Sequence, residues 1–233
     1  MLVVVTREVG RNDTLRDWLT PTATILEVPL TATAYRPLPE VEADLALAGD
    51  HGPFAVLAVT SARSRNYLEA ARRVCARDVE VWTVGATTSG AVTDAGLAVS
   101  GEAHSALEVA RQIDHGPVLA LGAREMRGEL ATELAARAIH VQTVVCYETV
   151  PLEPDEAARA AIRSADAVVI GAPSAWRVAR TLVSPATWVV VPGETTGAAV
   201  RADHDRVLVG WHAASARRLE ELVAGERSSP GAQ

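Results

Sequence analysis

The sequence predicts an α/β protein of two doubly wound, parallel-sheet domains of the flavodoxin or Rossmann type. Short aliphatic runs alternate with helical stretches along the whole chain, as in units built on parallel strands. A strand–glycine–threonine–threonine segment occurs twice, at 81–92 and at 188–200. Gly85 and Gly193 lie 108 positions apart, and so do His104 and His212. A repeat that keeps its register over this distance predicts two similar units.

The expected strands are continuous apolar runs, which are typical of parallel strands covered on both faces. The first is Leu2-Val3-Val4-Val5. A β-branched segment at 31–35 is expected to be extended, and Pro37 and Pro39 end it. In chain order, strands are expected at 2–5, 25–30, 54–59, 80–84, 97–99, 117–121, 140–145, 167–170, 187–191 and 206–209.

The expected helices begin at polar or hydroxyl residues and end near glycine or proline. Asn12 or Asp13 is the candidate cap of the first helix, which runs through Leu19, and Gly96 ends the helix at 87–95. In chain order, helices are expected at 13–19, 41–48, 62–75, 87–95, 105–113, 125–137, 154–163, 172–182, 195–202 and 213–223, with a flexible tail at 225–233.

The order of these elements predicts that the first domain is discontinuous. The elements within residues 1–30 are too few to close a core, so we expect them to join those of residues 152–233. Residues 36–145 would form the second domain. The segments 31–35 and 146–151 would then cross between the domains as a two-stranded hinge beside a cleft.

Composition narrows the classes of function. The 22 basic residues are all arginine, which excludes a lysine Schiff base and a P-loop lysine. A net charge of −7 without a basic stripe argues against nucleic-acid binding. No apolar run reaches the roughly 18 residues of a membrane span, and no signal peptide is visible, so we expect a cytoplasmic protein. Cys75 and Cys146 are expected to be buried free thiols.

Several other site types have no matching pattern. The sequence lacks Gly-x-Gly-x-x-Gly after the first strand and metal-ligand histidine spacing, so we expect no dinucleotide site and no metal, and it has no Gly-x-Ser-x-Gly nucleophile elbow. A phospho-receiver-like domain is disfavoured because no aspartate ends the first strands. His104 and His212 are interpreted as cap or loop residues.

Small and hydroxyl residues recur where strands end and helices start. Ligands of open α/β sheets bind beyond the carboxyl ends of strands, and a helix start has unpaired N–H donors suited to carboxylates. The alternative for each residue is simple N-capping, whereas several sites directed at one cleft favour a polyanionic ligand. These segments are Thr6-Arg7, Thr60-Ser61, Gly85 with Thr87-Thr88, Gly122 with Arg124 and Arg127, Gly171 with Pro173-Ser174, and Gly193 with Thr195-Thr196.

Taken together, these segments resemble the uroporphyrinogen-III synthase family over nearly the whole chain, to about Val223. The resemblance implies two α/β domains joined by a two-stranded linker, with the first domain discontinuous. The segments that carry it are Val5-Thr6-Arg7, Val59-Thr60-Ser61, Val84-Gly85-Ala86-Thr87-Thr88, Leu121-Gly122 with Arg127, Val145-Cys146-Tyr147-Glu148-Thr149, Pro173-Ser174 and Gly193-Glu194-Thr195-Thr196.

The resemblance also implies a reaction, the cofactor-free closure of the linear tetrapyrrole hydroxymethylbilane with inversion of its ring D and loss of water. Tyr147 matches the family's tyrosine and would donate a proton to the leaving hydroxyl, although a structural role is equally open. Thr88 and Thr196 would bind the acetate or propionate groups of the substrate. The full set of expected substrate-binding residues is Arg7, Thr60, Ser61, Thr87, Thr88, Arg127, Ser174, Thr195 and Thr196. A monomer is expected, with no membrane or nucleic-acid partner.

The sequence departs from the family pattern in two places. Gly171-Ala172 stands where the family usually has Thr-Ser, so one hydroxyl is missing, and Ala62 replaces a common proline. The alternative hypothesis is therefore a non-catalytic module that binds a small anionic or tetrapyrrole ligand in a hinged cleft.

Overall fold

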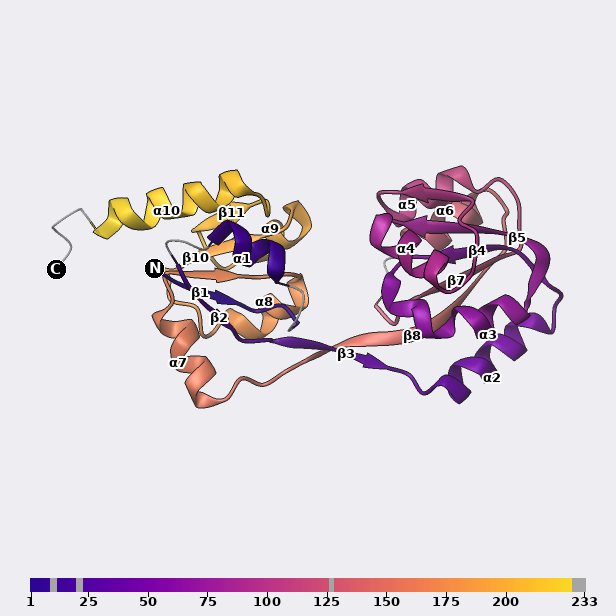
Figure 1. Ribbon diagram of the computed structural model, residues 1–233, viewed down its shortest axis with the longest axis horizontal. Coiled ribbons are helices and arrows are strands. Elements are labelled where there is room, and N and C mark those ends of the chain that lie inside the picture. The colour runs from indigo at the N-terminus through magenta and orange to yellow at the C-terminus, as the bar shows by residue number, and fades with distance from the viewer. Residues whose placement is uncertain (9–11, 20–22, 126–127, 228–233) are drawn as a thin grey trace. The chain divides into compact units, whose positions relative to one another are not determined.

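The computed structural model describes residues 1–8, 12–19, 23–125 and 128–227. The chain forms two compact units (Figure 1). Unit 1 comprises Met1–Ala32 and Val150–Gln233, and unit 2 comprises Thr33–Thr149. Both contain a parallel-strand sheet flanked by helices, which confirms the predicted fold class.

The sheet of unit 1 has five strands in the order β11-β10-β9-β1-β2, and every pairing is parallel. Helices α7, α8 and α9 pack on one face, around Val4, Val168 and Val189. Helices α1 and α10 pack on the other face, around Val3 and Val5. The strands are β1 (Leu2–Val5), β2 (Thr24–Glu27), β9 (Ala167–Val169), β10 (Trp188–Val191) and β11 (Val207–Val209). The helices are α1 (Asp13–Leu19), α7 (Glu156–Ser164), α8 (Pro173–Ala179), α9 (Glu194–Arg201) and α10 (Ala213–Arg227).

The sheet of unit 2 has the order β3-β8-β7-β4-β5-β6, and its five strands from β8 to β6 pair in parallel. Helices α2, η1, α3 and α4 pack on one face of the sheet, and α5 and α6 pack on the other. The strands are β3 (Thr31–Tyr35), β4 (Phe54–Val59), β5 (Cys75–Val84), β6 (Gly101–Ala103), β7 (Val118–Ala123) and β8 (Val141–Pro151). The helices are α2 (Leu38–Gly49), the 3₁₀ helix η1 (Ala62–Tyr67), α3 (Leu68–Arg73), α4 (Ala86–Asp94), α5 (Ala106–Gln112) and α6 (Glu129–Ala136).

The two sheets share one arrangement, β2-β1-β9-β10-β11 in unit 1 and β8-β7-β4-β5-β6 in unit 2. Gly85 and Gly193 are the N-cap residues of α4 and α9, which follow corresponding strands. The repeat in the sequence therefore reflects a repeat in the structure. The units differ in chain order, because the first two strands of unit 1 precede all of unit 2.

Strands β3 and β8 carry the chain into unit 2 and back out of it, and they are neighbours in its sheet. The backbone N–H of Arg36 donates to the Cys146 carbonyl at 3.0 Å. The Arg36 side chain donates to the Val145 carbonyl at 3.0 Å and to Asp44 at 2.6 Å. One arginine thus joins the end of β3 to both β8 and α2.

Several sequence-based boundaries were wrong, and three of these errors concern the place or type of a whole segment. The strand expected at 97–99 is β6 at Gly101–Ala103, because Leu97 and Val99 pack against the core within the connection. The helix expected at 62–75 is split into η1 and α3, and Cys75 begins β5. The tail expected from 225 is helical to Arg227, while residues 228–233 lie outside the described part.

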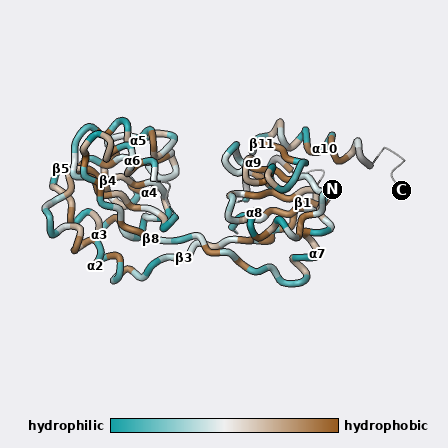
Figure 2. Tube along the Cα trace, turned by 180° about the vertical axis from the view of Figure 1, so that it is seen from behind, coloured by the Kyte–Doolittle hydropathy of each residue, from teal (hydrophilic) through white to brown (hydrophobic). Residues whose placement is uncertain are grey.

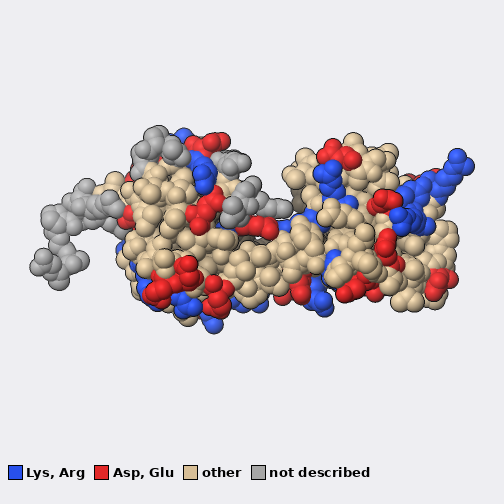
Figure 3. All heavy atoms as spheres, turned by 60° about the horizontal axis from the view of Figure 1, so that its bottom comes forward, with Lys and Arg blue, Asp and Glu red and all other residues tan. Residues whose placement is uncertain are grey.

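Hydropathy and charge follow this architecture. The hydrophobic colour in Figure 2 concentrates on the strands, in agreement with the fully buried Val3, Val4 and Leu119. On the face shown in Figure 3, acidic and basic side chains lie close together on both units. In the described residues, no helix has the length and apolar character needed to cross a bilayer.

Candidate functional site

The candidate residues of each unit lie at the carboxyl edge of its sheet, meaning the edge where the parallel strands end. In unit 2, Thr60 and Ser61 follow β4, and Gly85 with Thr87 and Thr88 follows β5. Tyr147 lies in β8, beside Ala123 at the end of β7. In unit 1, Arg7 follows β1, Ser174 lies in the first turn of α8, and Thr195 and Thr196 lie in that of α9. Arg127 lies outside the described residues.

Thr60 and Ser61 use their hydroxyl groups in different ways. The Thr60 hydroxyl donates to the Leu121 carbonyl at 3.1 Å, which fastens the end of β4 to β7. The Ser61 hydroxyl accepts from the Arg63 N–H at 3.2 Å and caps η1. Ser61 is therefore an N-cap, the alternative role considered for it. A capping hydroxyl retains its own O–H donor, so it can still bind a carboxylate.

Tyr147 is almost enclosed, with 5% of its surface exposed. Its ring centroid lies 6.2 Å from that of Tyr35, with the planes tilted by 52°. The guanidinium of Arg63 lies 5.8 Å from the Tyr147 ring centroid. Because the register of β7 and β8 shifts between Gly122 and Ala123, Tyr147 lies next to an irregularity, a feature that commonly redirects a side chain.

The hydroxyl of Tyr147 differs from that of Tyr67 in the same unit. The Tyr67 hydroxyl donates to the Arg36 carbonyl at 2.7 Å, and burial raises the pKa of this phenol. In the described part of the chain, no residue forms a hydrogen bond with the Tyr147 hydroxyl. Tyr67 thus has a structural hydrogen bond that Tyr147 lacks among the described residues.

The glycine–threonine segments of the two units differ at the glycine and agree at the threonines. Gly193, before α9, has extended backbone with φ of −170°. Gly85 has φ of +77°, a conformation that favours glycine, and precedes α4. The first threonine of each pair, Thr87 or Thr195, is exposed. The second, Thr88 or Thr196, is only 4% or 5% exposed. A ligand would therefore meet the first threonine and the free N–H groups of the helix start more readily than the second threonine.

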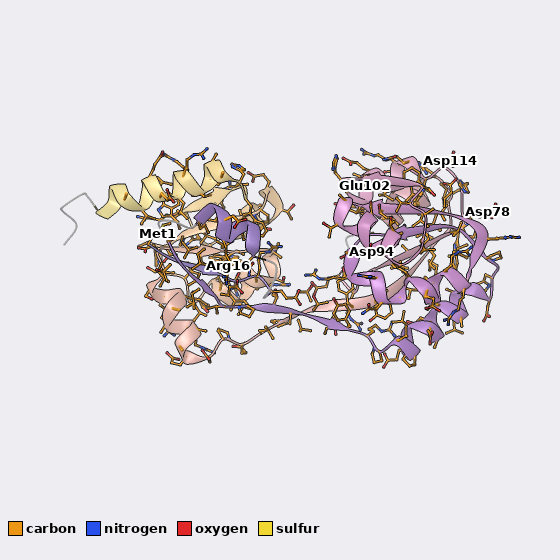
Figure 4. All side chains as sticks on the ribbon, in the orientation of Figure 1. Met1, Arg16, Asp78, Asp94, Glu102 and Asp114 are labelled. Carbon is orange, nitrogen blue, oxygen red and sulfur yellow. The ribbon has the colours of Figure 1, made fainter. Side chains whose placement is uncertain are left out.

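Charged partners flank these helix starts. The Ser89 hydroxyl, in the first turn of α4, contacts both Glu102 and the Thr83 hydroxyl. Figure 4 labels Glu102 within unit 2. In α9, Glu194 lies 2.7 Å from Arg201, and this hydrogen bond lowers the pKa of Glu194. Both carboxylates are thus held by polar neighbours of their own unit.

The carboxyl edge of the unit 1 sheet has different side-chain contacts from that of unit 2. The Thr6 hydroxyl is fully buried and donates to the Val169 carbonyl at 2.8 Å. The Arg7 guanidinium lies 4.5 Å from the centroid of the Trp211 ring. Ala172 is the N-cap residue of α8 and makes no side-chain cap. Ala172 occupies the place that Ser61 fills in unit 2, so the missing hydroxyl is also a missing cap.

Two neighbours of the candidate residues, Arg63 and Trp211, were not predicted from the sequence. Arg63 lies two residues after Ser61 and on a helical turn, so its spacing was a usable signal. Trp211 is 204 positions from Arg7, and no local pattern connects them. His212 and His104 lie before α10 and α5, as expected of cap or loop residues. The ring of His212 accepts from the Ser215 N–H, and the backbone N–H of His104 donates to the Glu108 carboxylate.

A sequence profile of a known protein family matches this chain. The profile described as "Uroporphyrinogen-III synthase HemD" matches residues 21–214. The chain belongs to the uroporphyrinogen-III synthase family. A search of curated proteins gives no match.

Solved uroporphyrinogen-III synthases share the fold of this chain. A mutant enzyme from the extremely thermophilic bacterium Thermus thermophilus aligns over 97% of this chain and 99% of its own, with a TM-score of 0.64 and 16% identity. The enzyme from Helicobacter pylori aligns over 95% and 98%, with a TM-score of 0.64 and 15% identity. At this identity the likeness concerns the fold, and the roles of individual residues must be argued from the chain itself.

Proposed function

We propose that this protein closes hydroxymethylbilane to uroporphyrinogen III, with inversion of ring D and loss of water. Family membership supports the substrate class. The observation that carries the proposal is the environment of Tyr147, a nearly enclosed phenol without a hydrogen-bond partner among the described residues, in the unit whose sheet edge also has helix starts and hydroxyls suited to carboxylates.

In this proposal, the Tyr147 phenol donates its proton to the terminal hydroxyl of the bilane, and water leaves. The resulting azafulvene carbon bonds to the substituted carbon of ring D and gives a spiro intermediate. The bond from ring D to its original neighbour then breaks and leaves an azafulvene on that neighbouring ring. The unsubstituted α-carbon of ring D bonds to this azafulvene carbon, which closes the macrocycle with ring D inverted. Loss of one proton from ring D restores the pyrrole. Arg63 and Tyr35 hold the phenol ring in place through their contacts with its faces and edges.

The remaining residues bind the carboxylates of the substrate. In unit 2, these are Thr60, Ser61, Thr87 and Thr88, together with the first N–H groups of η1 and α4. In unit 1, they are Arg7, Ser174, Thr195 and Thr196, with Arg127 as a further candidate. Because the bilane closes without enzyme to the uninverted isomer, the protein acts mainly by holding the conformation in which the less accessible bond forms first. The position of the substrate between the units, the monomeric state and the cytoplasmic location stay predictions.

A second function has one observation in its favour. The loop after β9 has no hydroxyl at Gly171 and Ala172, whereas the corresponding loop of unit 2 has two, at Thr60 and Ser61. A binding module that retained the substrate without converting it would fit this loss.

One experiment separates the two functions. Purified protein is mixed with freshly prepared hydroxymethylbilane, and the oxidised uroporphyrins are separated by isomer. We expect isomer III, with heat-denatured protein giving only isomer I. Binding of the bilane with isomer I as the sole product would favour the binding module.

A further inference from the structure

Arg7 and Trp211 meet across the carboxyl edge of the unit 1 sheet. Arg7 follows β1, and Trp211 follows β11 after Gly210. Two strands, β9 and β10, lie between them, so their backbones are separated by three strand spacings, or about 14 Å. Two long side chains are needed to bridge this span, and the guanidinium lies 4.5 Å from the ring centroid.

Gly171 leaves the room that this pair occupies. A Cβ atom on Gly171 would lie 3.1 Å from Cγ of Arg7 and 3.6 Å from Cη2 of Trp211. The first distance is shorter than an ordinary carbon–carbon contact, so a side chain here would displace Arg7. Glycine at position 171 therefore leaves the space in which the Arg7 side chain lies.

Unit 2 has the opposite arrangement at the corresponding positions. Matching the N-cap residues Ser61 and Ala172 makes Gly171 the counterpart of Thr60. In unit 2, Leu121 pairs with Val59. In unit 1, Val5 pairs with Val169, so Thr6 lies at the position that matches Leu121. The next residues, Arg7 and Gly122, therefore also correspond. Unit 2 thus has a threonine beside a glycine, and unit 1 has a glycine beside an arginine.

The exchange places a charged donor at the edge of unit 1, whereas the single O–H of Thr60 in unit 2 is already donated to the Leu121 carbonyl. Stacking occupies the face of a guanidinium, and its N–H donors lie in the plane, where they match the geometry of a carboxylate. The indole of Trp211 packs against the core cluster around Val3 and Val5. Its Nε1 atom is buried without a hydrogen-bond partner in the described residues, so Trp211 acts through its ring faces.

We infer that Trp211 is a positioning residue that holds Arg7, in the space left by Gly171, to bind a carboxylate of the tetrapyrrole substrate at unit 1. This inference rests on the proposed function. It assigns the substrate-binding work of the missing hydroxyl to a charged side chain, which makes Arg7 a determinant of affinity for acidic substituents.

The test is a set of variants assayed for KM and kcat with hydroxymethylbilane. Arg7→Ala is expected to raise KM about 10-fold or more, because a charge-assisted hydrogen bond is lost. Trp211→Leu is expected to raise KM about 3-fold or more with kcat nearly unchanged, and Trp211→Phe to restore most of the affinity. In the Arg7→Ala background, Trp211→Leu should add nothing further. Arg16→Ala, which removes an exposed arginine paired with Glu27 in the same unit, is the matched control and should leave KM unchanged.

A second cycle covers the case in which Trp211→Leu does not fold, as judged by its thermal melt. Gly171→Ala should raise KM in the otherwise unchanged protein and have no effect in the Arg7→Ala background. An unchanged KM in Arg7→Ala would overturn the inference. So would a Trp211→Leu or Gly171→Ala change that raises KM as much in the Arg7→Ala background as in the otherwise unchanged protein. Failure of the unchanged protein to form isomer III would instead contradict the proposed function.

Discussion

The Arg63 guanidinium lies 5.8 Å from the Tyr147 ring centroid, and Arg63 is also the residue whose N–H Ser61 caps. One short segment after β4 therefore contacts both the expected proton donor and an expected carboxylate-binding residue. Because Arg63 links them, a change in this segment is expected to affect catalysis and binding together.

Tyr147→Phe should lower kcat about 10-fold or more, because the proton donor is lost while the ring contacts with Tyr35 and Arg63 remain. The measurement is the rate of uroporphyrinogen III formation at saturating hydroxymethylbilane. Tyr67→Phe removes a phenol that already donates to the Arg36 carbonyl, so it should mainly lower stability and serves as the control. Equal kcat for Tyr147→Phe and the unchanged protein would assign Tyr147 a structural role.

Thr6→Val should lower the free energy of unfolding of unit 1 by about 1 kcal/mol, because it removes a buried hydrogen bond without changing side-chain volume much. Urea unfolding monitored by circular dichroism measures this change. Thr181→Val, at an exposed position of the same unit, should change it by less than about 0.5 kcal/mol. A Thr6→Val protein as stable as its parent would show that the Thr6 hydroxyl does not stabilise the end of β1.

The thiols of Cys75 and Cys146 should resist alkylation in the folded protein. Burial raises the pKa of each to about 11, so at pH 8 the reactive thiolate is about 100-fold scarcer than for a thiol at the reference pKa of 9.0. A thiol-reactive chromophore should label neither in native protein and both after denaturation. Rapid labelling of native protein would contradict the burial of these side chains.

The same pKa shifts predict how the stability of unit 2 depends on pH. Below pH 9 both thiols are protonated whether the unit is folded or unfolded, so the stabilisation is fully present. Between pH 9 and 11 the unfolded chain loses its thiol protons first, so the free energy of unfolding should fall, by up to roughly 2–3 kcal/mol per thiol. Urea unfolding at a series of pH values tests this, with Cys146→Ala as the control that should reduce the thiol contribution by about half, because Cys75 remains. A free energy of unfolding that stays constant from pH 9 to 11 would be inconsistent with the shifts.

Residues 33–149, expressed alone, should fold with a single cooperative unfolding transition. This segment is continuous and contains hydrophobic clusters on both faces of its sheet. Thermal unfolding followed by circular dichroism would show it, and Leu119→Asp, which places a charge in the core, should abolish the transition. A segment without native-like cooperativity would mean that unit 2 depends on unit 1.

The fold could be predicted from the sequence because its strands are continuous aliphatic runs and its repeat preserves the spacing of two glycines. Boundaries failed where local pattern and packing disagree. Leu97 and Val99 are apolar because they cover the core from a connection, so hydrophobicity alone made them a strand. The helix at 62–75 was placed too long because a 3₁₀ turn and an α-helix have similar sequence patterns.

The candidate site was only partly predictable. Hydroxyls after strands could be identified, because a helix start needs a cap and the position follows from the strand pattern. The hydrogen bond and burial of each hydroxyl could not be predicted. Ser61 caps a helix, the Thr60 hydroxyl donates to β7, and Thr88 is buried. The pairing of Arg7 with Trp211 depends on strand order across β9 and β10, which only the folded sheet defines.

We propose that the protein directs the bilane to its less accessible closure. The most direct measurement is the isomer ratio of uroporphyrinogen formed in a single turnover, with the protein in excess over hydroxymethylbilane so that closure in free solution is suppressed. We predict that isomer III is the dominant product. Isomer I in the proportion given by buffer alone would contradict it.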